Sequence, residues 1–496
     1  IEVALTWGNV TNFAGVVNDG KKLTDITHGT VEGVDWVIWS NKGSNSAQFP
    51  LIDYGFNSGD PNVWYHPVVT VKWILDKIQE QSGVTFNFPS DKLTVINKMI
   101  IPLLTRNDSQ EIYDAYPMTL RVTGYDSSII KFEAVGDSTQ QYVSTNGSRD
   151  IYPKFDSTLK LKGTIEVSYT YSQGIDYLNT PFQITVYSTP TKQEEIINIY
   201  KPAAYIEPPY IRLVYSFDTS ATVYKDGYFI ISSGNGKQPI NSVSGSLSVT
   251  ITEREEDVVL GEKFPLVPNL PDIKQIDFIK AVASMVGLFA LPDGENGIKF
   301  IPFDNLSANK SKAVDWTNRV IMAYNSVTPR NLQYTLDNIA QNNWFRYKED
   351  DNVMGNYDGN IQVDDATIEY ERDAITLPFS ACSTKGGVAY IPLYSYNEEG
   401  ELEYNKTNPR ILLLDGTKGI FEGLEWTTLI ANNYQTYKGL INNAKVVTEY
   451  IRLNSIELRD LEMDIPVYLA QYGCYLAIIE IKTKENDICE CKLLKL

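Results

Sequence analysis

Histidine is the side chain that most readily moves protons near neutral pH, and the chain has only two, His28 and His66. Neither lies in an H-E-x-x-H pattern or in a Cys/His spacing that would build a zinc site. We interpret both as structural histidines and expect substitution at either position to be tolerated.

An acidic loop from Asp350 to Asn360 superficially resembles a calcium site, because hard cations bind carboxylate and carbonyl oxygens. Met354, however, occupies a ligand position, and no glutamate stands at the closing one. We therefore interpret this loop as a solvated β-turn, and the sequence predicts no metal ligands and no cofactor.

Three adjacent carboxylates, Glu255, Glu256 and Asp257, raise the question of glycoside hydrolysis. Such enzymes place an acid and a base or nucleophile ~5–9 Å apart across the sugar. Adjacent carboxylates in a charged linker usually face solvent instead, so we predict no catalytic residues and no enzyme activity.

Tyrosines in the middle of the chain could stack on sugar rings, because an aromatic ring offers a large flat surface with one polar end. Alternation along strands should bury about half of them. A sugar-binding role for the whole region is a hypothesis. The candidates are Tyr169, Tyr171, Tyr187, Tyr215, Tyr224 and Tyr228.

The charge balance disfavours partners that carry phosphate. Lys and Arg total 43 against 62 Asp and Glu, which gives a net charge of −19, and no stretch forms a basic stripe. We expect no sequence-specific nucleic-acid binding. The sequence has no run of ~18 apolar residues, so we predict no membrane span. Whether a leader was removed before Ile1 stays open.

The four cysteines are too few for a disulfide-stapled scaffold. Cys489 and Cys491 lie two apart on an expected strand, so they share one face with Leu493 as small core residues. This usage fits a reducing compartment or a particle interior.

Two copies of one short unit organise the chain: an amphipathic helix, a glycine, and a strand with an aromatic residue. The first copy runs from Val71 to Ile78 and closes with Gly83 to Phe86. The second runs from Ile276 to Ala283 and closes with Gly287 to Phe289. A repeat after about two hundred residues, without a short tandem period, favours two related domains over a solenoid.

The remaining pattern is mainly β. Strands are expected at Met118 to Thr123, Ile129 to Ala134, Leu159 to Tyr171, Phe182 to Tyr187, Tyr210 to Phe217, Tyr228 to Ser233 and Leu247 to Thr252. This spacing is typical of a β-sandwich or jelly roll. We further expect a polar loop at Asn305 to Asp315, one helix along Trp426 to Ile441, and barrel strands at the C-terminal end.

These elements predict a mainly β, multidomain chain with short helices. Four segments follow: 1–105 and 263–420 as related α+β barrel-like units, 106–262 as a β-sandwich insertion, and 421–496 as a helix with barrel strands. Three prolines, Pro265, Pro268 and Pro271, mark the boundary before the second copy of the helical unit.

Two stretches have a distinctive pattern: Pro271 to Lys280 leads into Gly287-Leu288-Phe289, and Ile465-Pro466-Val467-Tyr468-Leu469 is followed by Tyr475 to Lys482 and Cys489 to Leu494. They resemble the tail-tip or baseplate hub proteins of tailed bacteriophages and prophages. The first stretch is similar to the helix that enters the second hub domain, and the second resembles the closing barrel hairpin. The long segment 106–262 departs from a minimal hub.

The resemblance implies a structural role. In hub proteins two related domains per subunit, repeated in a homotrimer, make a pseudo-sixfold ring that joins the tail tube to a spike. Implied partners are tube, spike and tape-measure proteins, with host glycans as a hypothesis for the insertion. The implied location is the virion tail, assembled in the bacterial cytoplasm. The alternative is a bacterial surface protein that binds or degrades glycans.

Overall fold

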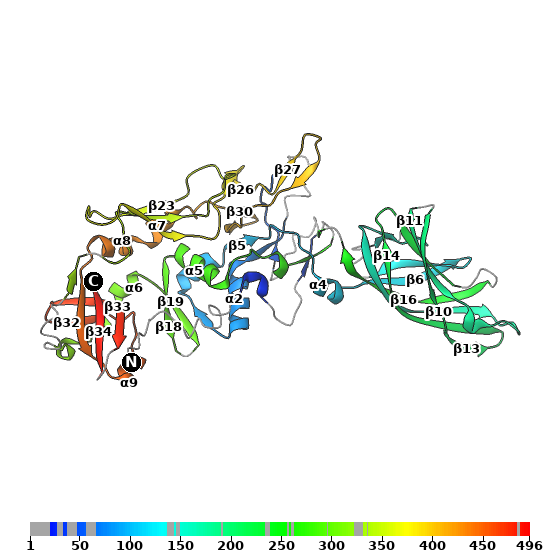
Figure 1. The fold of residues 1–496 in the computed structure, drawn as a ribbon, viewed down its shortest axis with the longest axis horizontal. Coiled ribbons are helices and arrows are strands. Elements are labelled where there is room, and N and C mark those ends of the chain that lie inside the picture. Colours follow the sequence, from blue (N-terminus) through cyan, green and yellow to red (C-terminus); the bar gives the residue numbers. More distant parts are fainter. Residues whose placement is uncertain are drawn as a thin grey trace. The chain divides into compact units, whose positions relative to one another are not determined.

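The chain divides into two compact units in a computed structural model, and each unit is described by itself (Figure 1). Unit 1 comprises Ile1–His28, Lys42–Leu104 and Leu270–Leu496, and unit 2 comprises Gly29–Asn41 and Thr105–Asn269. The structure describes residues 20–26, 33–36, 47–55, 66–135, 143–144, 149–189, 192–233, 239–254, 257–258, 262–294, 296–321, 331–334, 336–483 and 487–496.

Strands dominate the regular structure in both units, which confirms the prediction of a mainly β, multidomain chain. The predicted insertion, 106–262, lies within unit 2. The segments 263–420 and 421–496 lie in unit 1, apart from residues 263–269. The four-segment division within this arrangement stays a prediction.

Unit 2 contains all seven strands expected from the sequence. Its elements are β1 (Gly33–Asp35), α4 (Gln110–Ala115), β6 (Met118–Asp126), β7 (Ile129–Val135), β8 (Val143–Ser144), β9 (Tyr152–Pro153), β10 (Ser157–Thr170), η3 (Tyr177–Asn179), β11 (Phe182–Thr189), β12 (Lys192–Ile199), β13 (Ala203–Glu207), β14 (Tyr210–Val223), β15 (Tyr228–Ser233), β16 (Ile240–Arg254), β17 (Lys263–Pro265) and η4 (Val267–Asn269).

One nine-stranded sheet forms the body of unit 2, in the order β12-β11-β15-β7-β6-β16-β10-β14-β13. The sheet curls until β11 faces β14, where the ring of Phe182 stacks on that of Tyr215 with centroids 5.1 Å apart. Alternate residues point inward, so Leu213 is buried while its neighbour Arg212 is only half-buried. A single curled sheet thus encloses the sandwich-like core.

Unit 1 combines short helices with small sheets. Its helices are η1 (Leu23–Asp25), α2 (Val71–Ser82), α3 (Ser90–Ile96), α5 (Gln275–Met285), α6 (Asp304–Ala308), η5 (Asn309–Lys312), η6 (Thr317–Arg319), α7 (Trp426–Asn433), α8 (Gln435–Asn442) and α9 (Ser455–Arg459). Its strands are β2 (Ala47–Gln48), β3 (Val68–Thr70), β4 (Thr85–Asn87), β5 (Met99–Pro102), β18 (Leu288–Asp293), β19 (Gly297–Pro302), β20 (Val314–Asp315), β21 (Asn331–Gln333), β22 (Asn342–Arg346), β23 (Gly359–Gln362), β24 (Glu371–Thr376), β25 (Ser383–Lys385), β26 (Val388–Tyr390), β27 (Tyr394–Tyr396), β28 (Leu402–Tyr404), β29 (Leu412–Asp415), β30 (Lys418–Ile420), β31 (Val446–Arg452), β32 (Val467–Leu469), β33 (Cys474–Thr483) and β34 (Ile488–Lys495).

The two copies of the helical unit form as predicted and meet in one sheet. After each helix the glycine adopts a left-handed conformation, with φ of 70° at both Gly83 and Gly287. The strands β4 and β18 flank β19, with β4 parallel and β18 antiparallel to it. Strands that begin about two hundred residues apart therefore share one three-stranded sheet.

A curled six-stranded sheet in the order β20-β32-β33-β34-β31-β21 contains the expected C-terminal strands. Residues 314–321, here called the closing segment, begin with β20 beside β32 and contact β31 at their other end. The Trp316 N–H donates to the Tyr468 carbonyl of β32 (3.0 Å), and the Ile321 N–H donates to the Tyr450 carbonyl of β31 (2.8 Å). Cys489 and Cys491 are buried in the core of this barrel-like sheet together with Leu493, which confirms the prediction for both.

Two local predictions were wrong. The expected polar loop at Asn305 to Asp315 contains the short helices α6 and η5, because Leu306 turns inward and anchors the turn. The single expected helix at 426–441 breaks at Tyr434, whose φ and ψ of −121° and 13° separate α7 from α8. No helix within the described ranges combines the length and apolar content that a bilayer crossing requires.

Candidate functional site

Of the two histidines, only His66 lies among the described residues, and it is 2% exposed in unit 1. Its ring centroid lies 5.5 Å from that of Tyr54, another buried residue. His28 lies outside the described residues. Within those ranges, no cluster of three or more His, Cys, Asp or Glu side chains is arranged to hold a metal ion.

The loop that superficially resembles a calcium site holds a buried ion pair. Asp350 accepts a hydrogen bond from the Arg410 Nη2 at 2.5 Å, and the two side chains are 5% and 0% exposed. The Arg410 guanidinium also donates to the Asn408 carbonyl (2.6 Å) and the Thr407 hydroxyl (3.3 Å). The expectation of a solvated turn was therefore wrong for Asp350, although Met354 is exposed.

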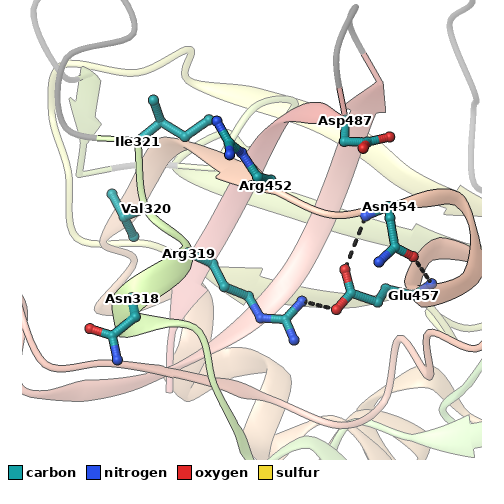
Figure 2. Close-up of a pocket in the computed structure, with 8 residues that line it drawn as sticks. All are labelled: Asn318, Arg319, Val320, Ile321, Arg452, Asn454, Glu457 and Asp487. Atoms are coloured by element: carbon teal, nitrogen blue, oxygen red, sulfur yellow. Dashed lines mark hydrogen bonds and ion pairs between the residues drawn. The ribbon is translucent and has the colours of Figure 1, made fainter.

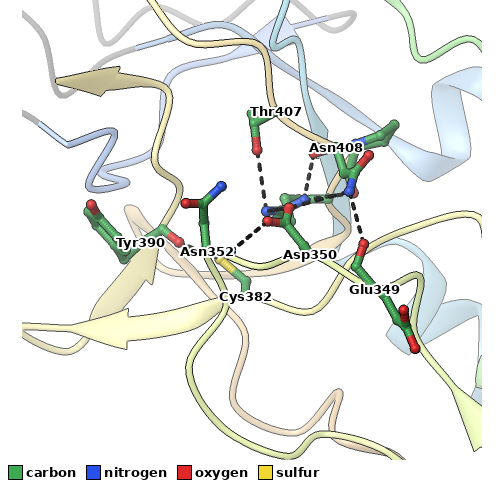
Figure 3. Close-up of polar contacts among 9 residues, drawn as sticks. Glu349, Asp350, Asn352, Cys382, Tyr390, Thr407 and Asn408 are labelled. Atoms are coloured by element: carbon green, nitrogen blue, oxygen red, sulfur yellow. Dashed lines mark hydrogen bonds and ion pairs between the residues drawn. The ribbon is translucent and has the colours of Figure 1, made fainter.

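Hydrogen bonds and charge keep the pKa of the Asp350 carboxyl below its ordinary value. Burial by itself would raise the pKa of Asp350, but the Asn352 N–H, which donates to this carboxylate at 3.0 Å, and Arg410 together lower it. Beside them the Cys382 thiol donates to the Tyr390 carbonyl, and burial raises the pKa of that thiol to about 12 (Figure 3). Cys382 is thus a protonated core residue and a poor nucleophile.

The acidic linker is only partly described, because Glu255 and Glu256 lie outside the described residues. Asp257 is exposed and lies 3.6 Å from the Arg106 guanidinium. The buried carboxylate of this region is Glu262, which accepts a hydrogen bond from the Arg254 Nη1 at 2.9 Å. The Arg254 guanidinium also lies 3.8 Å from the ring centroid of Phe155, so this ion pair is a structural feature of the unit 2 core.

The candidate tyrosines separate into buried and surface residues. Tyr169 and Tyr215 are each 1% exposed, so they belong to the core and are unavailable to a sugar. Tyr171 and Tyr224 are exposed. Tyr187 and Tyr228 are half-buried and stack on one another with centroids 4.8 Å apart. The six tyrosines therefore do not form one site.

A surface pocket of about 490 Å³ opens where the closing segment meets the end of β31 (Figure 2). It is lined by Asn318, Arg319, Val320, Ile321, Arg452, Asn454, Glu457 and Asp487. The pocket contains two guanidinium groups and two carboxylates, so donors and acceptors are balanced there. It is suited to polar contacts with a partner.

Two contacts fix the shape of this pocket. The Arg319 Nη1 donates to the Glu457 Oε1 at 2.5 Å, which ties the closing segment to α9. Asn454 and Glu457 form a reciprocal capping box at the start of α9. In it the Asn454 backbone N–H donates to the Glu457 carboxylate, and this hydrogen bond lowers the pKa of Glu457 more than the contact with Arg319 does. The spacing Asn454-x-x-Glu457 is visible in the sequence as a helix start, but its link to Arg319 is not.

No protein-family model matches the chain, and no curated protein sequence is similar to it. Solved structures give low-scoring likenesses. Eiger TNF from S. frugiperda is 8% identical with a TM-score of 0.20, and the match covers 29% of this chain and 98% of that one.

Two further likenesses are to tail proteins. The 43 kDa tail protein of prophage MuSo2 from Shewanella oneidensis is 8% identical with a TM-score of 0.22, over 69% of this chain and 95% of that one. The tail protein from Neisseria meningitidis MC58 is 7% identical with a TM-score of 0.19, over 69% and 96%. At TM-scores this low, the likenesses establish no relationship.

Proposed function

We propose that the chain is a structural component of a phage or prophage tail, and that it acts as a tail-tip or baseplate hub between the tail tube and a spike or host-recognition part. The proposal starts from the resemblance of Pro271 to Phe289 and of the C-terminal hairpin to hub proteins. It assigns the chain no enzymatic activity, and its location is the virion tail after assembly in the bacterial cytoplasm.

The observation that carries the proposal is the meeting of the two helix-glycine-strand copies in unit 1. Both copies contribute strands to the sheet β18-β19-β4. Asn433 also contacts elements near both copies: it accepts a hydrogen bond from the Lys92 Nζ of α3 (2.7 Å) and donates one to the Met285 carbonyl of α5 (3.3 Å). A subunit built this way carries two related surfaces in a fixed arrangement.

Two related surfaces in each subunit would let a threefold hub match a sixfold tube. Three subunits in a closed ring would present six similar contacts, which is what a sixfold tube requires of a threefold adaptor. On this proposal the chain is a homotrimer in the particle, and its partners are the tube, spike and tape-measure proteins. Unit 2 interrupts unit 1 between the two copies and extends the hub with a β-domain of its own.

Light scattering over a wide concentration range tests the self-assembly. A trimer has three times the chain mass of 55.9 kDa, and that mass would support the proposal. A monomer at every concentration, together with failure to bind purified tube and spike proteins, would remove it. The glycan-active alternative predicts a monomer with sugar turnover or sugar binding alone.

A further inference from the structure

The outer face of unit 2 carries an array of hydroxyl groups across three long paired strands. On β16 every second residue from Ser242 to Thr252 is Ser or Thr. These side chains point away from the core, since the alternate residues Leu247 and Val249 are buried. We call this outer side of β10, β14 and β16 the hydroxyl face. Its hydroxyl residues are Thr158, Thr164, Ser168, Thr170, Ser216, Ser220, Thr222, Ser242, Ser244, Ser246, Ser248, Thr250 and Thr252.

Two exposed tyrosines stand at one end of the hydroxyl face. Tyr205 of the edge strand β13 is 51% exposed, and Tyr210 of β14 is 49% exposed. Arg212 pairs directly with Tyr205 across the strands, and in the next row Tyr210 pairs with Glu207. The two rings are diagonal neighbours on one face, a relation that separates residues by ~7–8 Å.

The orientation of Tyr205 is set by the arginine. The Arg212 guanidinium carbon lies 5.5 Å from the Tyr205 ring centroid, so one face of the ring is turned to the cation. Tyr205 is 51% exposed, so we take the opposite face of its ring to be open to solvent. The row continues through Ser168, which is buried at 8% exposure, to the exposed Ser242, whose hydroxyl lies in the same row.

The charges around Arg212 decide which ligand this end of the face accepts. The Arg212 Nη1 lies 3.4 Å from Glu166, and its Nη2 lies 3.6 Å from Glu207. Two carboxylates therefore surround one guanidinium, which leaves a local excess of negative charge. An anionic ligand would be repelled, whereas a neutral ligand would find carboxylate acceptors and hydroxyl groups that both donate and accept.

We propose that Tyr205, Tyr210 and the adjoining hydroxyl face form a binding site for a neutral oligosaccharide. The apolar C–H face of a sugar ring would pack on the open side of Tyr205, and the next sugar would pack on Tyr210. Ring hydroxyls would bond to the exposed side chains of Thr170, Ser242 and Glu207. This inference rests on unit 2 alone and does not depend on the proposed tail role.

The test uses the full-length chain, labelled and applied to an array that carries neutral oligosaccharides beside sialylated and uronic-acid ones. The site predicts binding to neutral glycans only. Tyr205→Ala and Tyr210→Ala should each weaken that binding about tenfold, and Tyr205→Phe should retain it. Tyr224→Ala, at an exposed tyrosine outside the site, is the matched control and should change nothing.

Thermal melting of every variant shows whether it folds. Because the substituted positions are exposed, we expect every variant to fold. Three results would overturn the inference: no binding to any neutral glycan, a preference for acidic glycans, or equal loss of binding in Tyr224→Ala. If the chain binds glycans but neither trimerises nor binds tail proteins, the glycan site is supported and the proposed tail role is wrong.

Discussion

Arg410 and Asp350, a buried ion pair of unit 1, depend on one another. Each is removed from water, so deletion of one leaves the other uncompensated in the core. We expect Arg410→Met to lower the free energy of unfolding by about 3–5 kcal/mol. Urea denaturation would measure this loss.

The control for that variant is Arg459→Met, because Arg459 and its partner Asp460 are both exposed. An exposed pair contributes little, so this variant should unfold like the parent chain. Equal stability of the two variants would contradict a structural role for the buried pair.

Acid should weaken the same pair. The pKa of Asp350 is lower in the folded chain than in the unfolded one, so its contribution is present above the unfolded pKa and is lost as the pH falls through the folded value. We expect the free energy of unfolding to fall as the pH drops below about 4, the ordinary range of an Asp carboxyl.

The matched comparison is Asp350→Asn, which should show a smaller fall over the same pH range. Chemical denaturation at several pH values in that range measures both chains. An unchanged slope in the variant would show that other carboxyl groups cause the acid sensitivity.

The sequence predicts the burial of an individual residue only where a local pattern exists. The alternation around Cys489 and Cys491 predicts their burial, and the structure confirms it. Asp350 and Arg410 lie 60 positions apart and share no spacing rule, so their contact follows from the fold alone. The same holds for Arg319 and Glu457 at the pocket.

At the scale of elements, the glycines after the two helices provide a matched pair. Both have φ of 70°, a conformation that costs a residue with a Cβ about 1–2 kcal/mol. A Cβ on Gly83 would meet nothing within 4 Å, whereas on Gly287 it would lie 2.5 Å from the Asn433 Cβ and 2.8 Å from its carbonyl oxygen.

Gly287→Ala should therefore destabilise the chain by more than Gly83→Ala, because α7 must shift to admit the new methyl group. Gly83→Ala should cost only the backbone strain of about 1–2 kcal/mol. Denaturant titration of both variants measures the difference. Equal losses would contradict the close approach of Asn433 to the second copy.

Elements with a strong hydrophobic period were predictable, and edge elements were not. The helices α2 and α5 and seven strands of unit 2 follow from apolar periodicity. The edge strands β12 and β13 were missed because most of their side chains, and all of those of β13, are exposed, so no buried face imposes alternation. Tyr205 of the proposed glycan site lies on such a strand.

At the scale of the molecule, the division into two units predicts more than one unfolding transition in calorimetry. Phe182→Ala, in the core of unit 2, and Phe278→Ala, in the core of unit 1, each remove a side chain that is 0% exposed. Each should cost about 3–5 kcal/mol and lower a different transition. A single transition that both variants shift equally would contradict two independent cores.

The central claim is that a doubled unit in each of three subunits makes a hub with six similar contacts. Electron microscopy of the purified chain, with tube protein added, tests it most directly. The account predicts a closed threefold ring whose tube-facing side shows pseudo-sixfold symmetry. Particles that contain one copy of the chain, or rings without threefold symmetry, would contradict it.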